Sequence, residues 1–118
     1  MDRYRTALDD LPWTEPPGER RGVRIKFLGE SFERGPWVTL VEQVPGYVEP
    51  PHWHEGDTVY IVRRGELSVP GEGIFRAGDV RRVQRGVFYG PEVAGPEGVQ
   101  IWLVSNARPL LHYEAPTD

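Results

Sequence analysis

The most regular pattern in the chain is an alternation of apolar and charged residues at positions 22–28. Here Val23, Ile25 and Phe27 are separated by a single charged residue each time. Successive side chains of a β-strand point to opposite faces, so this pattern predicts a strand with one buried face. Further short apolar runs follow and are separated by turns rich in Gly, Pro and Asp. We therefore predict strands at 22–28, 37–44, 58–62, 67–69, 73–75, 80–83, 99–104 and 110–113.

The turns between these runs recur at a spacing of roughly 8–12 residues, which is typical of an antiparallel sandwich or barrel. Composition agrees, because 14 Gly and 12 Pro among 118 residues oppose long helix interiors. Val alone supplies 14 residues, and β-branched side chains favour strands. The predicted fold class is therefore all-β and antiparallel.

A chain of 118 residues is long enough for one domain. The polar segment 1–21 predicts an N-terminal arm with one helical turn near 6–11, and residues 22–118 predict a single β-domain. Leu8 and Leu11 give the arm an apolar surface. We expect the arm to pack on the domain or on the second subunit of a homodimer.

Charge and residue usage restrict the class of protein further. The net charge of −4 disfavours a nucleic-acid partner, which normally meets a basic face. The absence of cysteine excludes disulfides, cysteine zinc sites and a thiol nucleophile. No stretch has the apolar length of a membrane span or a signal peptide, so we expect a cytoplasmic protein with no membrane partner.

Two of the three histidines, His52 and His54, are separated by one residue. In an extended segment, residues i and i+2 share a face, so both imidazoles project together. Imidazole is the commonest protein ligand for Zn, Cu, Fe and Ni. The spacing is therefore compatible with a shared metal ion, and two ordinary surface histidines after Pro50-Pro51 are the alternative.

The surrounding segment resembles the first motif of the cupin superfamily. That motif consists of Gly, five residues, His-x-His, three or four residues, Glu, six residues and Gly. Gly46, His52, His54 and Gly65 stand at the matching positions, and Thr58 stands where the family has its Glu ligand.

A second segment resembles the second cupin motif, which runs Gly, five residues, Pro-x-Gly, two residues and His. Gly78 and Gly86 match it, whereas Gln84 replaces the Pro and Tyr89 replaces the His ligand. The resemblance covers residues 36–105 and includes the spacing between the two motifs. The segment that follows is similar to small single-domain cupins of the dihydroxyacetophenone dioxygenase type.

This resemblance implies a jelly-roll β-barrel with its site inside the barrel. Typical cupins hold Fe, Mn, Ni, Zn or Cu with three His and one Glu, and this chain keeps two of those four groups. A divalent transition metal would therefore bind His52 and His54 and need a substitute ligand. The candidates for it are Tyr89 and, after it, Asp57, Thr58 and His112.

The same groups suit proton chemistry without a metal. His52 or His54 could act as a general base, since the ordinary pKa of imidazole is ~6.5. Tyr89 could donate a hydrogen bond to a developing enolate or phenolate oxygen. A third possibility is that these side chains only form hydrogen bonds with one another inside a narrow barrel and have no chemical role.

Strand periodicity suggests further side chains for the cavity wall. Tyr60 and Val62 share the face of Thr58, and Trp102 belongs to the apolar run at 99–104. Arg81 and Arg82 are adjacent, so one of them faces inward if their strand lines the barrel. Glu42 is a possible partner for that arginine, and a position at the rim with both side chains in water is the alternative. The expected lining is Thr58, Tyr60, Val62, Arg82 and Trp102.

Taken together, these features predict a small cupin-type enzyme that acts on a small aromatic, phenolic or ketone molecule. Metal-assisted dioxygenation and proton-transfer isomerisation or cyclisation are the reactions that the resemblance implies. His52, His54 and Tyr89 are the expected catalytic residues. The alternative is a metal-free binding or sensing cupin without catalysis.

Overall fold

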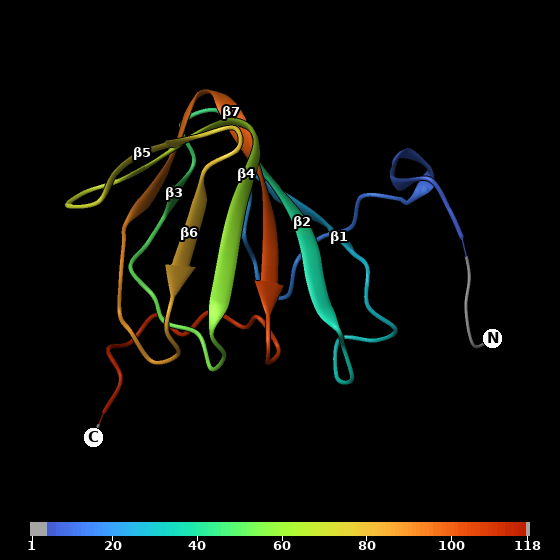
Figure 1. The fold of residues 1–118 in the computed structure, drawn as a ribbon. Helices are drawn as coiled ribbons and strands as arrows, with labels where there is room; N and C mark the ends of the chain where they lie inside the picture. Colours follow the sequence, from blue (N-terminus) through green and yellow to red (C-terminus); the bar gives the residue numbers. More distant parts are fainter. Residues whose placement is uncertain (1–4, 118) are drawn as a thin grey trace.

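The computed structural model describes residues 5–117, which form a bent antiparallel sheet of seven strands (Figure 1). Within these residues no helix is long and apolar enough to cross a membrane. The one helical element described is the short 3₁₀ helix η1, Leu8–Asp10, in the region where a helical turn is predicted. The strands are β1 Val23–Phe27, β2 Trp37–Gln43, β3 Val48–Glu49, β4 Thr58–Val69, β5 Gly73–Arg76, β6 Val80–Val83 and β7 Glu92–Ser105.

The two longest strands, β4 and β7, run through both layers of the fold. The first part of β4 pairs with β6 and with the end of β7, and β2 and β1 extend this layer. The second part of β4 pairs with β5 and with the start of β7, which also pairs with β3. The all-β, antiparallel prediction is confirmed.

The bend between the layers depends on close contact between two glycines. The β4–β7 register shifts on both sides of this point, between Val62 and Arg64 and again between Gly65 and Leu67. Gly65 has a φ of 77°, and a Cβ atom there would lie 2.1 Å from the Gly98 carbonyl oxygen. Only glycine allows both the positive φ and this approach of two backbones.

The structure corrects four of the strand predictions. Strands predicted at 58–62 and 67–69 are one bulged strand, β4, because the bulges absorb the turn-like residues between them. The run at 99–104 is only the second half of β7. The predicted strand at 110–113 is a single bridge between Trp53 and His112, and the short β3 was not predicted.

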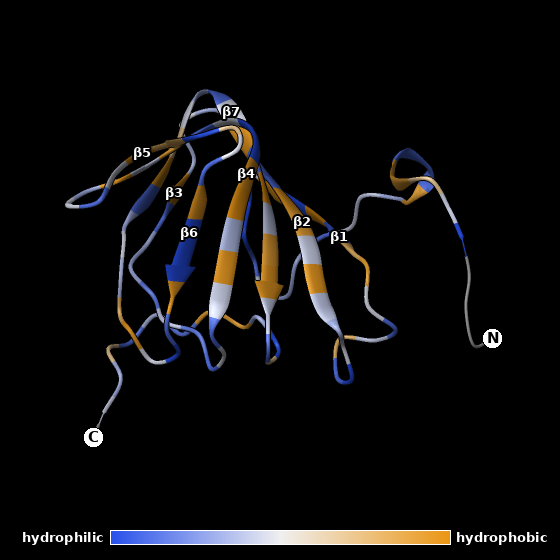
Figure 2. Ribbon diagram, in the orientation of Figure 1, coloured by the Kyte–Doolittle hydropathy of each residue, from blue (hydrophilic) through white to orange (hydrophobic). Residues whose placement is uncertain are grey.

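Alternation along the strands places the core between the two layers. Figure 2 shows apolar and polar bands succeeding one another along β2, β4 and β7. In β4, Thr58, Tyr60 and Val62 are buried, and the residues between them are only half-buried. The core is built of two clusters, of which the larger contains Tyr60, Val62, Leu67, Val69, Tyr89, Ala94, Val99 and Ile101, and the smaller Val23, Ile25 and Val41.

The predicted arm packs on the sheet through backbone and side-chain contacts. The backbone N–H groups of Thr14 and Ile25 each donate to the other residue's carbonyl, both at 2.8 Å. Lys26 Nζ donates to the carbonyl of Leu8 at 2.9 Å. Residues 1–4 of the arm and Asp118 lie outside the described residues, and the homodimer stays a prediction.

The Gly65–Gly98 contact gives a test of the bend. We expect Gly65→Ala to lower the free energy of unfolding by at least ~3 kcal/mol, because it combines backbone strain with a clash against backbone. Gly78→Ala is the matched control, since Gly78 has a φ of 93° but no atom within 4 Å of its added Cβ. The control should cost ~1–2 kcal/mol from its φ alone. Equal losses in urea unfolding of the two variants would contradict this account.

Candidate functional site

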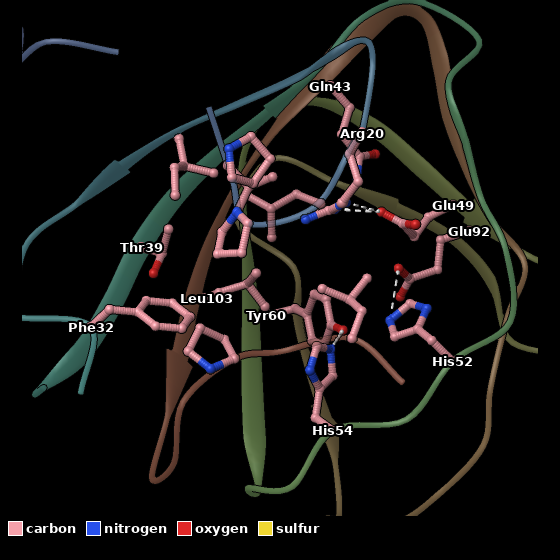
Figure 3. Close-up of a pocket in the computed structure, with 17 residues that line it drawn as sticks. Arg20, Phe32, Thr39, Gln43, Glu49, His52, His54, Tyr60, Glu92 and Leu103 are labelled. Carbon is pink, nitrogen blue, oxygen red and sulfur yellow. Dashed lines mark hydrogen bonds and ion pairs between the residues drawn. The ribbon is translucent and has the colours of Figure 1, made fainter. Parts of the chain in front are cut away.

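A cavity lies between the layers and is closed by segments outside the sheet (Figure 3). The space that the centres of water molecules can occupy is about 40 Å³, room for roughly three waters. Its lining combines apolar strand residues with a group of polar side chains near one end. The lining residues are Pro16, Pro17, Arg20, Ile25, Phe32, Thr39, Val41, Gln43, Glu49, His52, His54, Tyr60, Glu92, Ile101, Leu103, Pro109 and Leu111.

The histidine pair is held beside Tyr89 by backbone hydrogen bonds. The N–H of His52 donates to the carbonyl of Tyr89 at 2.9 Å, and the N–H of Tyr89 donates back at 3.0 Å. The ring centroids of His52 and His54 are 5.0 Å apart, and that of Tyr89 is 4.6 Å from His52. The structure therefore brings together the three residues that the sequence predicts as catalytic.

Both imidazoles present the same nitrogen to the cavity. His52 Nδ1 lies 2.8 Å from the carbonyl of Pro50, and His54 Nδ1 lies 2.9 Å from that of Leu110. A carbonyl oxygen only accepts, so each Nδ1 carries the proton. In the neutral rings, each Nε2 then keeps its lone pair. Burial, with a smaller contribution from the charge of His52, lowers the pKa of His54 to about 4, so this ring is neutral at pH 7.

Two phenol groups extend the site. The hydroxyls of Tyr60 and Tyr89 are hydrogen-bonded to each other, and the Tyr60 hydroxyl lies 3.4 Å from His54 Nε2. Burial raises the pKa of both phenols above its ordinary value, and the nearby carboxylate of Glu92 adds to this effect. Both hydroxyls therefore keep their protons and can donate hydrogen bonds.

The sequence did not identify Glu92, a buried carboxyl group in the same cavity. Glu92 Oε1 faces His52 Nε2 at 3.8 Å, a separation longer than a hydrogen bond. Glu92 Oε2 accepts a hydrogen bond from Arg81 Nη1. Burial raises the pKa of Glu92, and this effect exceeds the opposing influence of His52 and Arg81. A carboxyl group in such surroundings can exchange a proton with a molecule in the cavity.

Arg81 is the inward-facing member of the arginine pair. Its Nε and Nη2 donate to the carboxylate of Glu72 at 2.8 and 2.7 Å, and its guanidinium carbon lies 4.9 and 4.7 Å from the ring centroids of Tyr60 and Tyr89. Arg82 is exposed, so the expectation that it lines the cavity is wrong. Because both residues are arginines, the sequence does not show which of the two faces inward. The expected partner, Glu42, pairs with Arg24 instead.

A second buried carboxylate, Glu49, lies beside the polar side chains of the cavity. It accepts hydrogen bonds from Arg20 of the arm, from Tyr47 at 3.2 Å and from Tyr113 at 2.9 Å. Sequence reasoning missed Glu49 as it missed Glu92. The available signal was that each glutamate adjoins a proline at one terminus of a strand, Glu49 at the end of β3 and Glu92 at the start of β7, which is weak evidence for burial.

Several other expected residues lie away from the cavity. The Thr58 hydroxyl donates to the carbonyl of Gly56 at 3.2 Å, and Val62 packs in the core. Trp102 lies on the outer face, beside Leu8 and other arm residues, because the inward positions of β7 are its neighbours at 101 and 103. The prediction that Trp102 lines the cavity is wrong.

The two remaining candidate metal ligands also lie outside. Asp57 is exposed and accepts hydrogen bonds from the backbone N–H of Arg85 at 2.9 Å and from the side-chain amide of Asn106. His112 stacks on Trp53 and its Nε2 lies 3.1 Å from a carboxylate oxygen of Glu55. Neither side chain reaches His52 and His54.

The groups present do not fit a three-histidine, one-glutamate metal site. Thr58 and Tyr89 occupy the two remaining motif positions, where a hydroxyl replaces the carboxylate and the imidazole, and these hydroxyls are engaged with Gly56 and Tyr60. The carboxylate near the pair, Glu92, is held by a guanidinium cation. In the described part of the chain no three His, Asp or Glu side chains converge as a ligand set. The donors fit a proton-exchanging, hydrogen-bonding site.

Comparisons with known proteins place this sequence in a family. The profile of the family described as ChrR Cupin-like domain matches residues 1–108. A search of curated protein sequences gives no match. KdgF from Halomonas sp. is 26% identical, with a TM-score of 0.68 over 86% of this chain and 94% of that chain.

Two further solved structures share the fold of this chain. A chain in the complex of Rhodobacter sphaeroides SigE with the anti-sigma ChrR is 25% identical, with a TM-score of 0.65 over 84% of this chain and 51% of that chain. The polyketide cyclase RemF from Streptomyces resistomycificus is 19% identical, with a TM-score of 0.74 over 98% and 88%. These likenesses confirm the predicted jelly-roll barrel.

The buried Arg81–Glu92 ion pair predicts different effects on stability for substitutions of Arg81 and Arg82. Arg81→Met leaves Glu92 buried without its cation, and we expect it to lower the free energy of unfolding by ~3–5 kcal/mol. The control Arg82→Met should stay within ~0.5 kcal/mol of the wild type, since Arg82 is exposed. Adding Glu92→Gln to Arg81→Met should restore part of the loss in urea unfolding. Similar effects of the two arginine variants would contradict the assignment.

The low pKa of His54 predicts a dependence of stability on pH. Between pH 6.5 and about 4 the unfolded chain takes up a proton at this residue that the folded protein does not. The free energy of unfolding should therefore fall as the pH drops through this window, by up to ~3 kcal/mol from His54 alone. His54→Asn should flatten the curve, measured by urea unfolding at pH 7, 5.5 and 4.

Proposed function

This chain belongs to the family of ChrR cupin-like domains, and on that premise we propose that it catalyses proton transfer on a small organic molecule held inside the barrel. The reaction class is isomerisation of an unsaturated ketone or cyclisation of a diketone, and both begin when a proton leaves the carbon next to a carbonyl group. The observation that carries this proposal is the carboxyl group of Glu92, buried in the cavity with a raised pKa and facing His52.

The base in this proposal is Glu92. Its Oε1 removes a proton from the carbon next to the substrate carbonyl, and the C–H electron pair becomes the new carbon–carbon double bond. The carbonyl π pair moves to oxygen, which gives an enolate. For isomerisation the substrate is a β,γ-unsaturated ketone. The enolate oxygen pair re-forms the carbonyl, the double bond shifts between the α- and β-carbons, and the β,γ π pair takes the proton back from Glu92 at the γ-carbon. In cyclisation the enolate carbon attacks a second carbonyl carbon, whose oxygen takes the proton. No oxidant or reductant is required.

The neighbouring groups stabilise the enolate and position the base. The protonated Tyr60 hydroxyl lines the cavity and can donate to the developing negative oxygen. While Tyr60 donates its single proton to the substrate, its oxygen accepts from the Tyr89 hydroxyl, and His54 Nε2 accepts from Tyr60 only when no substrate is bound. Arg81 fixes the orientation of Glu92 by holding its second oxygen. His52 Nε2 lies 3.8 Å from Glu92 Oε1 and offers a lone pair beside this base.

Exchange of substrate hydrogen with solvent tests this proposal directly. We expect the wild type to speed deuterium incorporation from heavy water into the methyl group of 4-hydroxyacetophenone at least ~100-fold over buffer, followed by NMR. Glu92→Gln should bring the rate down to that of buffer, because an amide cannot take up the proton. Glu42→Gln is the matched control, an ion-paired strand glutamate outside the cavity.

Three results would overturn proton transfer by Glu92. One is an undiminished exchange rate in Glu92→Gln. Another is the absence of enzyme-dependent exchange with 4-hydroxyacetophenone and with aliphatic ketones of similar size. The third is oxygen uptake that appears on addition of iron(II) or manganese(II), which would instead indicate the metal-assisted dioxygenation implied by the cupin resemblance.

A second candidate is a binding or sensing module without catalysis. Its support is the 25% identity to a chain in the SigE complex with the anti-sigma ChrR. The cavity supports it as well, because its charged groups are already paired with one another. Saturable binding of a ketone without any hydrogen exchange would favour this function.

A further inference from the structure

Two buried polar atoms in the cavity wall have no hydrogen-bond partner among the described residues. They are Thr39 Oγ1 and Gln43 Oε1, on side chains that are 3% and 5% exposed. Most buried polar atoms are paired, because an unpaired one loses its hydration without compensation. Both residues line the cavity, so a molecule bound there can complete their hydrogen bonding.

The two atoms belong to opposite ends of one wall. Thr39, Val41 and Gln43 alternate on the inner face of β2, which separates the outer two Cα atoms by roughly 13 Å. Figure 3 shows Thr39 near Phe32 at one end and Gln43 near Arg20 at the other. Between them the wall is apolar and the inner face of β7 adds Ile101 and Leu103.

The charged groups around the cavity are already paired with one another within the protein. Arg20 pairs with Glu49, and Arg81 pairs with Glu92 and Glu72. An ionic ligand would have to break one of these buried pairs, which is costly. The unpaired atoms are instead one amide oxygen, which only accepts, and one hydroxyl oxygen. The cavity is therefore better suited to an uncharged molecule that carries hydrogen-bond donors.

One wall of the cavity is formed by segments outside the named strands of the sheet. Pro16 and Pro17 come from the arm, and Pro109 and Leu111 come from the C-terminal segment, all outside the strands. Space for roughly three waters is too small for an aromatic molecule, so admission of one requires this wall to move. Thr39 and Gln43 are fixed in β2, so their spacing persists when the wall shifts.

We propose that Thr39 and Gln43 select an uncharged molecule with an apolar, ring-sized middle and a hydroxyl group at each end. Gln43 Oε1 accepts from one hydroxyl, Thr39 Oγ1 pairs with the other, and the inner faces of β2 and β7 contact the middle. This inference rests on the proposed function, because it describes the molecule that the Glu92 site would act on. It assigns substrate selection to two residues outside the histidine motif.

The test compares two probes of similar size, 4-hydroxybenzyl alcohol and 4-methylanisole, by NMR or calorimetric titration. The first has a hydroxyl donor at each end of its ring and the second has none. We expect the wild type to bind the diol at least ~10-fold more tightly. The double variant Thr39→Val, Gln43→Met should lose this preference, and its melting temperature should equal or exceed that of the wild type, because it removes two unpaired buried atoms.

Matched variants separate this inference from its competitors. Glu42→Met changes a polar residue on the same strand outside the cavity and should keep the preference for the diol. Equal affinity of the wild type for both probes would overturn the inference, and would mean that the two atoms hold only buried water. An unchanged preference in the double variant would overturn it as well.

The outcome for the proposed function is read independently. Binding is measured without turnover, and Glu92→Gln should retain the preference for the diol while it abolishes hydrogen exchange. If the wild type exchanges substrate hydrogen but shows no preference for the diol, the inference is rejected and the proposed function stands. The reverse pattern would reject catalysis and leave a selective binding site.

Discussion

The structure depends above all on the pairing of Arg81 with Glu92 inside the barrel. Both side chains are almost completely withdrawn from water, where an isolated charge of either sign would be strongly unfavourable. The pair therefore fixes each member's position. Arg81 lies over the rings of Tyr60 and Tyr89, and Glu92 is left with one oxygen directed at His52. The chemistry of the cavity follows from that constraint.

Much of the fold was predictable from local pattern, and the reasons are visible in particular elements. β1 alternates strictly, so its position followed from Val23, Ile25 and Phe27 alone. The segment at 52–54 and Tyr89 were predicted by motif spacing, and backbone hydrogen bonds bring them together. β4 was divided wrongly because Gly65 has the signature of a turn, whereas its contact with Gly98 makes it a bend within a continuous strand.

The buried glutamates of the site escaped prediction, and the physical reason is a different one. Glutamates are usually exposed, so Glu49 and Glu92 carry at most a weak local sign of burial, and their arginine partners lie 29 and 11 positions away in the sequence. Trp102 was misplaced because its run is apolar on both faces and shows no alternation. Orientation in such segments is decided by pairing across the sheet, which a single sequence does not display.

Glu49 joins segments from the two ends of the chain at one buried carboxylate. Arg20 reaches it from before the first strand and Tyr113 from after the last, and the same two segments supply the prolines of the cavity wall. The barrel and the roof of its cavity are therefore built from separate parts of the sequence. Evolution can reshape the chamber by altering the flanking segments alone, while the strands that carry Glu92 and the tyrosines stay as they are.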